Sequence, residues 1–180
     1  IDGESARNYG LTVQESANVY VKGIQFQNCT NGFQASNSKV SLTRCKAKNN
    51  SSSGFLARDH STVDFGSCVA TQNTYDGFEI TEGSSANFTN CSSLNNVFVC
   101  IGLFFSFATF NGTGHFSENG SGGMYIYHNS SVFFIPGYQG QIRNNGQFGI
   151  SLSWLSSTRY YTANTFSGNP SGDTWVQTGC

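Results

Sequence analysis

Residues 31–55 read NGFQASNSKVSLTRCKAKNNSSSGF, and the chain repeats this pattern about every 23 residues. The pattern starts with a Gly-Phe pair, passes through Ser-x-Val-x-Leu and Cys-x-Ala, and ends in asparagines before the next Gly-Phe. Its last asparagine recurs at steps of 23, 23, 23, 26 and 24 residues, at Asn50, Asn73, Asn96, Asn119, Asn145 and Asn169. A period of this length that persists along a chain indicates a repeat architecture.

Within each repeat, apolar residues alternate with polar ones, which is the period of strands with one buried face. The residues assigned to the first inward column are Phe33, Phe55, Phe78, Cys100, Met124 and Ile150. Those assigned to the second are Ala35, Ala57, Ile80, Gly102, Ile126 and Leu152. This alignment leaves Ile101 and Leu103 pointing outward.

A residue type that returns at every 23rd position must lie over its counterpart one strand spacing away, as in a chain that winds once per repeat. Crossover connections between parallel strands are almost always right-handed. The sequence therefore predicts an all-β fold, a single-stranded right-handed parallel β-helix of about seven coils with roughly 23 residues per coil. We expect residues 1–180 to form a single β-helix domain that is a piece of a longer protein.

The composition excludes several classes of protein. The formal net charge is −1, and charged residues make up only 11% of the chain, so a basic nucleic-acid surface is not expected. No apolar run approaches the ~20 residues of a membrane span. Asparagine, serine and glycine recur at the predicted turns, where an asparagine amide can bond to the asparagines of the neighbouring coils.

The cysteines are predicted to be structural. None of the six forms a C-x-x-C pair, which argues against a zinc ribbon or a thioredoxin-type site. Cys45, Cys68 and Cys91 share one column, where we expect them to point inward as small apolar side chains. Neighbouring coils are close enough for a disulfide, but a ladder of free thiols is favoured. No metal and no cofactor are predicted.

Asp59 and Glu82 are the candidate catalytic residues, because the repeat stacks them at one turn of two consecutive coils. Carbohydrate cleavage commonly uses two carboxyl groups. Two stacked carboxylates also push their pKa values apart, which gives an acid beside a base. Asp76 and Glu79 lie nearby on the same coils. The favoured interpretation is that these are solvated surface groups, with Arg58 relieving the repulsion.

The outward residues of coils four to six are predicted to be apolar or aromatic, whereas the same face is polar on the earlier coils. Such a patch marks an interface, either between subunits or with sugar rings that stack on it. Subunit packing is favoured, because Ile, Leu and Phe are poorer sugar platforms than Tyr and Trp. The residues predicted for a homotrimer contact are Ile101, Leu103, Phe104, Phe105 and Tyr125. Those predicted for ligand binding are Tyr127, His128 and Trp154.

The Gly-Phe, Ser-x-Val, Cys-x-Ala and Asn steps over residues 31–119 resemble the right-handed parallel β-helix repeats of the pectate-lyase-like superfamily. They are most similar to those of bacteriophage tail spikes and tail fibres. Such relatives are typically homotrimers that bind, and often cleave, bacterial surface polysaccharide. The resemblance implies a receptor-binding segment in the virion tail, or otherwise an extracellular or cell-surface protein.

Three functions remain open from the sequence. The first is a tail spike or tail fibre segment that recognises bacterial surface glycan. The second is a polysaccharide-degrading enzyme, a glycoside hydrolase or lyase, that uses the surface carboxylates. The third is a structural adhesin stalk with no ligand of its own. No nucleic-acid partner and no membrane span are expected for any of them.

Overall fold

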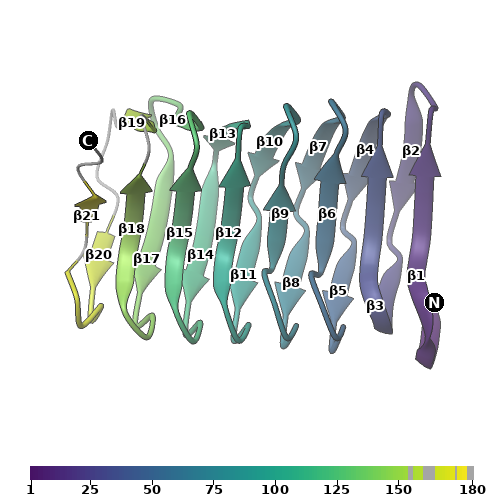
Figure 1. Ribbon diagram of the computed structural model, residues 1–180, viewed down its shortest axis with the longest axis horizontal. Helices are drawn as coiled ribbons and strands as arrows, with labels where there is room; N and C mark the ends of the chain where they lie inside the picture. Colours follow the sequence, from purple (N-terminus) through teal and green to yellow (C-terminus); the bar gives the residue numbers. More distant parts are fainter. Residues whose placement is uncertain (154–155, 160–164, 173, 178–180) are drawn as a thin grey trace.

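The computed structural model describes residues 1–153, 156–159, 165–172 and 174–177. In these ranges the chain forms strands and turns and no helix. Strands of successive coils pair in parallel and build three walls (Figure 1). The predicted fold class is confirmed: an all-β right-handed parallel β-helix of about seven coils, with roughly 23 residues per coil.

We name each wall after one of its strands. The β6 wall contains β1 (Asp2–Gln14), β3 (Gln25–Ser36), β6 (Phe55–Arg58), β9 (Phe78–Ile80), β12 (Val99–Phe104), β15 (Gly122–Tyr127), β18 (Phe148–Ser153) and β21 (Thr174–Gln177). The β7 wall contains β2 (Val19–Lys22), β4 (Lys39–Thr43), β7 (Thr62–Gly66), β10 (Ser85–Thr89), β13 (Phe107–Asn111), β16 (Ser131–Phe134) and β19 (Ser157–Arg159). The β8 wall contains β5 (Lys46–Lys48), β8 (Val69–Thr71), β11 (Ser92–Leu94), β14 (Thr113–Ser117), β17 (Gln139–Arg143) and β20 (Thr165–Ser167).

The core is a stack of side chains in register between the walls. Phe33 pairs with Phe55, and Phe55 with Phe78, and the rings of Phe55 and Phe78 stack with centroids 5.0 Å apart. On the β7 wall, the rings of Phe65 and Phe88 stack with centroids 5.1 Å apart. Offset stacking of this kind adds to the gain from burying the rings, and it fills the narrow interior of each coil.

Coil four differs from the sequence alignment by one residue. The structure pairs Ile101 with Phe78 and Met124, and it pairs Leu103 with Ile80. Ile101 and Leu103 therefore point inward and are fully buried. The prediction that they lie on an outward subunit contact is wrong, because a one-residue shift moves every side chain of a strand to the opposite face.

Cys100 explains the misalignment. It occupies the position that glycine holds on the neighbouring coils, as in Gly77 and Gly123, so Ile101 is the true counterpart of Phe78. Its thiol is buried and donates a hydrogen bond to the carbonyl oxygen of Ser93 over 3.3 Å. Gly102, assigned to the core from the sequence, faces outward instead.

The predicted asparagine ladder is confirmed. The side-chain amide of Asn50 donates to Oδ1 of Asn73 over 2.9 Å, and Asn73 donates to Asn96 over the same distance. The ladder continues through Asn119 and Asn145. Each Oδ1 also accepts a hydrogen bond from the backbone N–H of the asparagine one coil earlier. These buried amide and N–H groups therefore keep hydrogen-bond partners within the turn.

Cys45, Cys68 and Cys91 are buried free thiols that stack in one column, as the sequence predicts for their position. The thiol of Cys68 donates to the carbonyl oxygen of Leu42 over 3.4 Å, and that of Cys91 to Phe65 over 3.3 Å. Cys180 lies outside the described residues. The thiols are weak donors, and here they bond to backbone carbonyl oxygens while their side chains fill a corner of the core.

Candidate functional site

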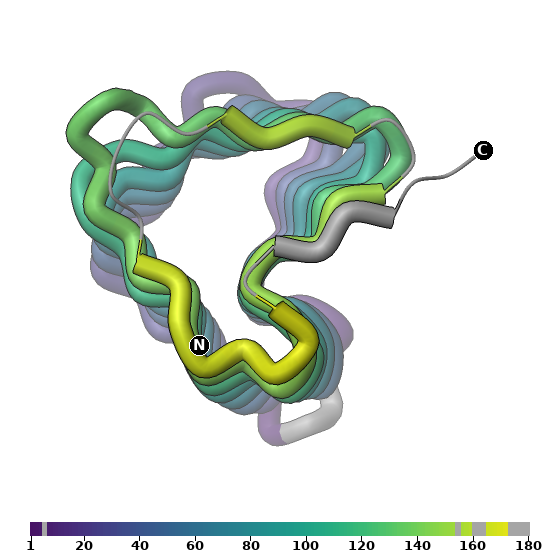
Figure 2. Tube along the Cα trace, turned by 90° about the vertical axis from the view of Figure 1, so that its left-hand side faces the viewer, coloured from purple at the N-terminus to yellow at the C-terminus, as the bar shows by residue number. Residues whose placement is uncertain are grey.

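The outer face of the β6 wall is a recessed surface. Viewed down the axis, the outline of the coil bends inward along this wall (Figure 2). Its central outward column consists of Gln34, Leu56, Glu79, Gly102, Tyr125 and Ser151. Although they point away from the core, Gln34 is only 4% exposed, Leu56 8% and Ser151 0%. We call this surface the recessed face.

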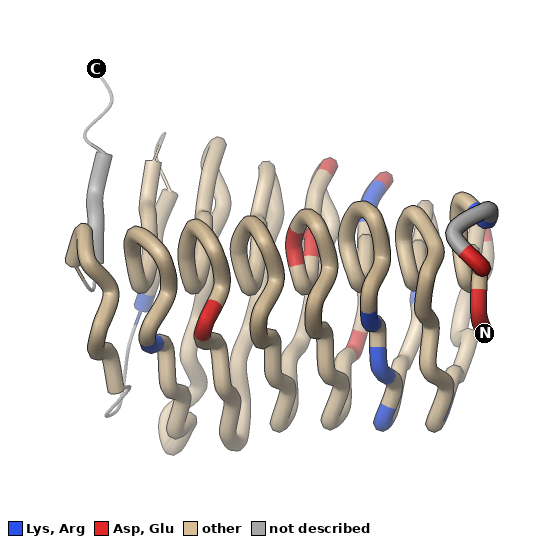
Figure 3. Tube along the Cα trace, turned by 90° about the horizontal axis from the view of Figure 1, so that it is seen from below, with Lys and Arg blue, Asp and Glu red and all other residues tan. Residues whose placement is uncertain are grey.

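Charge is distributed unevenly along the molecule. Acidic and basic residues lie mainly on the N-terminal coils (Figure 3). From residue 83 to the end of the sequence, the formally charged residues are Glu118, Arg143, Arg159 and Asp173. The recessed face carries Arg58 and Glu79 on coils two and three and aromatic side chains on coils four to six. The predicted change from polar to aromatic along the axis is present, but without Ile101 and Leu103, which lie in the core.

A continuous row of rings covers the aromatic half of the recessed face. The ring of Tyr125 lies 5.9 Å from that of Phe148 and 5.2 Å from that of Tyr127, centroid to centroid. Tyr127 in turn lies 5.3 Å from Phe104. All four side chains are half-buried, so each offers part of its ring to a ligand.

The predicted ligand-binding residues fall partly on this row. The imidazole of His128 packs edge-on against Tyr127, with centroids 4.0 Å apart. It also stacks on the exposed ring of Phe105 over 4.9 Å. The structure thus brings Tyr127 and His128 together, whereas Trp154 lies outside the described residues.

A second pair of rings lies in the turns that lead into β9 and β12. Tyr75 and Phe98 stack with centroids 5.0 Å apart and an interplanar angle of 12°. The pKa of Tyr75 is raised by burial and by the negative charges of Asp76 and Glu79. The negative charges of Asp76 and Glu79 therefore act on the hydroxyl group of Tyr75.

Asp59 and Glu82 are neighbours at one turn, as the sequence predicts. Both adopt the left-handed backbone region, with φ of 54° and 55°. Asp59 Oδ2 accepts a hydrogen bond from Ser36 Oγ over 2.5 Å, and it lies 3.2 Å from Nε of Arg58. Ser36 and the contact with Glu82 lower the pKa of Asp59, whereas the same contact raises the pKa of Glu82.

The opposite pKa shifts separate an acid from a base, but both shifts arise from the interaction of the two carboxyl groups with each other. Glycosidases hold theirs about 5–9 Å apart, because the sugar or a water molecule must fit between them. The catalytic assignment of this pair stays a prediction.

Asp76 is buried, so the interpretation of it as a solvated surface group is wrong. It is 1% exposed, and its Oδ1 accepts the backbone N–H of Val99 over 3.3 Å. Burial and the charge of Glu79 raise its pKa well above the ordinary value. Glu79 points outward in the central column, and its Oε2 accepts a hydrogen bond from Ser53 Oγ over 2.7 Å. Only its burial distinguishes Asp76 from an ordinary turn residue, and burial is not visible in the repeat.

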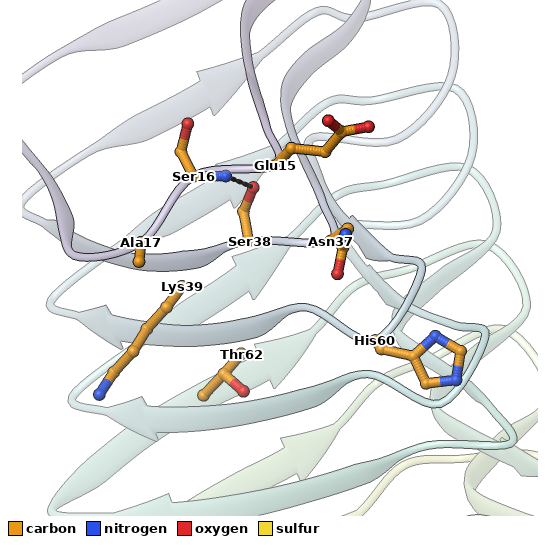
Figure 4. A pocket seen from close by; sticks show the side chains of 8 residues that line it. All are labelled: Glu15, Ser16, Ala17, Asn37, Ser38, Lys39, His60 and Thr62. Atoms are coloured by element: carbon orange, nitrogen blue, oxygen red, sulfur yellow. Dashed lines mark hydrogen bonds between the residues drawn. The ribbon is translucent and has the colours of Figure 1, made fainter.

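A pocket lies at the corner between the β6 and β7 walls of the first coils (Figure 4). It is lined by Glu15, Ser16, Ala17, Asn37, Ser38, Lys39, His60 and Thr62. The side chains of Glu15, Lys39 and His60 point away from one another in Figure 4, so they do not converge on a common ligand atom. We assign no chemistry to this pocket. Across the described residues, no three His, Cys, Asp or Glu side chains are placed to hold a metal ion.

Comparisons with known proteins identify the family. A family model described as "Right handed beta helix region" matches residues 4–136, which is more than half of the chain. The same comparisons found no curated protein and no solved structure that matches this chain. Within the described residues there is no helix that could cross a lipid bilayer.

Proposed function

Because the chain belongs to the family of right-handed beta helix regions, whose stacked coils build long continuous surfaces, we propose that its recessed face binds an extended polysaccharide. The observation that carries this proposal is the row of half-buried rings formed by Phe148, Tyr125, Tyr127 and Phe104.

The shape of the face suits a polymer. Six coils at ~4.8 Å each give a surface roughly 25–30 Å long, which can accommodate several sugar units in a row. Because the wall is recessed, a chain lying along it meets the floor and both flanks. Ligand surfaces of this kind combine apolar rings with a few placed polar groups.

The rings and the polar groups contribute to binding in different ways. Tyr125 and Tyr127 offer flat apolar area for the C–H face of a sugar, together with a hydroxyl that can bond to it. On the charged half, Arg58 and Glu79 can exchange hydrogen bonds with sugar hydroxyls. This half also provides specificity, because a ligand that buries Arg58 or Glu79 without giving it a hydrogen-bond partner binds more weakly.

The biological setting that we propose is receptor binding by a bacteriophage tail spike or tail fibre, with a bacterial surface polysaccharide as the ligand and the virion tail as the location. The resemblance of residues 31–119 to such repeats supports this setting. The family match is compatible with it and equally compatible with other polysaccharide-related proteins.

A homotrimer is the competing proposal for the same rings. Two of the five residues predicted for that contact, Ile101 and Leu103, are in the core. The rings that remain on the recessed face include Tyr125 and Tyr127, which suit sugars better than Ile and Leu do. We therefore favour the glycan as the occupant of this face.

The test is binding to capsular and O-antigen polysaccharides purified from bacteria and immobilised on a sensor surface. We expect Tyr127→Ala to weaken binding on the order of tenfold, since one ring contact contributes about 1 kcal/mol. The matched control is Tyr20→Ala, which removes an exposed ring from the β7 wall. Equal affinities of both variants would contradict the proposal. A trimer by light scattering that Tyr125→Ala dissociates would favour subunit packing instead.

A further inference from the structure

Two side chains of the central outward column offer hydrogen-bond acceptors to a ligand. Glu79 lies between Leu56 and Gly102 in this column and is half-buried. Ser53 of the preceding coil donates to its Oε2 over 2.7 Å, which holds the carboxylate in place. Oε1 of Gln34, two coils away in the same column, has no hydrogen-bond partner among the described residues, although Gln34 is only 4% exposed. A ligand that lies along the column therefore meets acceptors that need a donor.

The buried acceptor of Gln34 is an independent sign of the kind of ligand. Such an atom is costly in the free protein, and a ligand that donates a hydrogen bond to it removes that cost. A sugar hydroxyl both donates and accepts, whereas an ionised carboxylate or phosphate group mainly accepts. Gln34 thus favours a chain of units that carry hydroxyl groups over a chain of anions.

Positive charge is scarce along the recessed face. In the described strands β3 to β18 of the β6 wall, the charged residues are Arg58 and Glu79. The described turns on either side of these strands contain no lysine or arginine. Their charged residues are Asp59, Asp76, Glu82 and Glu118. The surroundings of the face are therefore acidic, although the chain as a whole carries a formal net charge of only −1.

The charge of Glu79 is not compensated within the described part of the chain. Arg58, the cation of these strands, is already engaged, because its Nε lies 3.2 Å from Oδ2 of Asp59. Glu79 itself forms no ion pair with a described residue. Its negative charge, after burial, contributes to the raised pKa values of Asp76 and Tyr75. A ligand that crosses coil three therefore meets a free carboxylate and no free cation.

We propose that the recessed face selects a neutral polysaccharide, and that Glu79 is the residue that excludes acidic chains. This inference rests on the proposed function and names the chemical class of its ligand. A neutral chain here is one whose units carry hydroxyl or acetamido groups. An acidic chain is one whose units carry carboxylates, as uronic acids do, or phosphates.

The interaction of Glu79 with the ligand depends on what the ligand places beside it. A sugar hydroxyl donates to the carboxylate, and a hydrogen bond to an ionised group is stronger than one between neutral groups. An anionic unit at the same place is repelled. Because Glu79 is half-buried, this repulsion is screened less by salt than it is between fully exposed charges. The same side chain thus favours one class of chain and disfavours the other.

The position of Glu79 makes the selection unavoidable for a long chain. Coils one and two of the recessed face lie on one side of it, and the ring row of coils four to six lies on the other. A chain that contacts both Gln34 and Tyr125 must pass over coil three. An acidic chain therefore either meets Glu79 or gives up one half of the face.

The experiment compares a neutral polysaccharide with its own acidic derivative. The full chain is first titrated with bacterial O-antigen and capsular polysaccharides, some neutral and some rich in uronic acids, and we expect binding to neutral ones. A polysaccharide that binds is then oxidised at part of its primary hydroxyl groups, which become carboxylates while the glycosidic bonds stay intact. The wild type should bind the oxidised form on the order of tenfold more weakly than the native form.

The ratio of these two affinities is the measured quantity for the variants. In Glu79→Gln it should fall close to one. Asp64→Asn is the matched control, because Asp64 is also a half-buried carboxylate, held by a hydrogen bond from Asn87 over 2.6 Å, but it lies on the β7 wall. Its ratio should equal that of the wild type. The wild-type ratio should also shrink between about 10 and 150 mM salt, as the Debye length falls from about 30 to 8 Å.

Each other outcome overturns the inference in a distinguishable way. Binding of the wild type to uronic-acid chains, or equal affinity for the native and oxidised forms, refutes the neutral class and leaves the proposed function standing. A ratio in Glu79→Gln that equals the wild-type ratio refutes the role of Glu79. A ratio that Asp64→Asn lowers as much as Glu79→Gln does assigns the effect to the charge of the whole protein and contradicts selection by this face. Binding to none of the polysaccharides refutes the proposed function itself, and the inference falls with it.

Discussion

The carboxyl group of Asp76 occupies the space that a side chain at Gly102 would fill. The two residues come from successive coils. The register that aligns Gly102 with Glu79 places this space next to the carboxyl groups of Asp76 and Glu79. A glycine in a strand interior weakens the strand, so its presence here has a local reason. That reason is the close approach of a buried acid to the backbone.

Gly102→Ala should therefore destabilise the protein, by about 1–3 kcal/mol in the free energy of unfolding, since the new methyl group forces Asp76 to move. Gly66→Ala is the matched control, because its Cβ would meet Thr43 Oγ1 only at 3.6 Å, an ordinary contact. Urea denaturation of both variants gives the comparison. Equal losses in the free energy of unfolding at the two positions would show that the missing side chain at Gly102 is not needed to accommodate Asp76.

Asp76 also makes stability depend on pH. The group ionises near 3.8 in the unfolded chain and at a higher pH in the fold. Between these two values the folded state binds more protons than the unfolded state, so stability falls as pH rises through this window. We expect Asp76→Asn to gain stability over the wild type on going from pH 4 to pH 7, measured by urea denaturation. A difference between the two proteins that does not change with pH would contradict the burial of a neutral acid.

The asparagine ladder should resist substitution at its centre. Asn96→Ala removes the acceptor of the Asn73 backbone N–H and side-chain amide and leaves both buried. We expect a loss of about 2 kcal/mol or more in the free energy of unfolding. Asn87→Ala, on the exposed side of β10, should cost well under half of that, although it gives up a bond to Asp64. Comparable losses would mean that the ladder adds nothing beyond surface hydrogen bonds.

The interaction between the carboxyl groups of Asp59 and Glu82 can be tested by titration. Asp59→Asn should lower the pKa of Glu82 toward its ordinary value, because the contact with Asp59 is the main cause that raises it. Carbon-detected NMR of the glutamate carboxyl groups measures the change. An unchanged pKa of Glu82 would show that the two side chains do not interact in solution.

The repeat allowed the fold to be predicted because side chains in a parallel coil lie over their counterparts. Stacked asparagines and phenylalanines in register leave a direct trace in the sequence. The alignment failed at coil four, where Cys100 replaces the glycine that marks each strand start. Without that marker, nothing local distinguishes the two faces of an apolar strand, and Ile101 was placed on the wrong one.

The candidate site was only partly predictable for a different reason. Tyr125, Tyr127 and the contact between Asp59 and Glu82 follow from register alone. The burial of Asp76 depends on the inward bend of the β6 wall and on how far a side chain reaches across the next coil. Neither the bend nor that reach is encoded in the spacing of residue types.

Polysaccharide binding by the recessed face is tested most directly by NMR mapping of the full chain, titrated with oligosaccharides from capsular and O-antigen polysaccharides that it binds. Shifts that concentrate on Tyr125, Tyr127 and Glu79, while Tyr20 on the β7 wall stays unperturbed, are the result that we predict. Shifts confined to the β7 or β8 wall would contradict it.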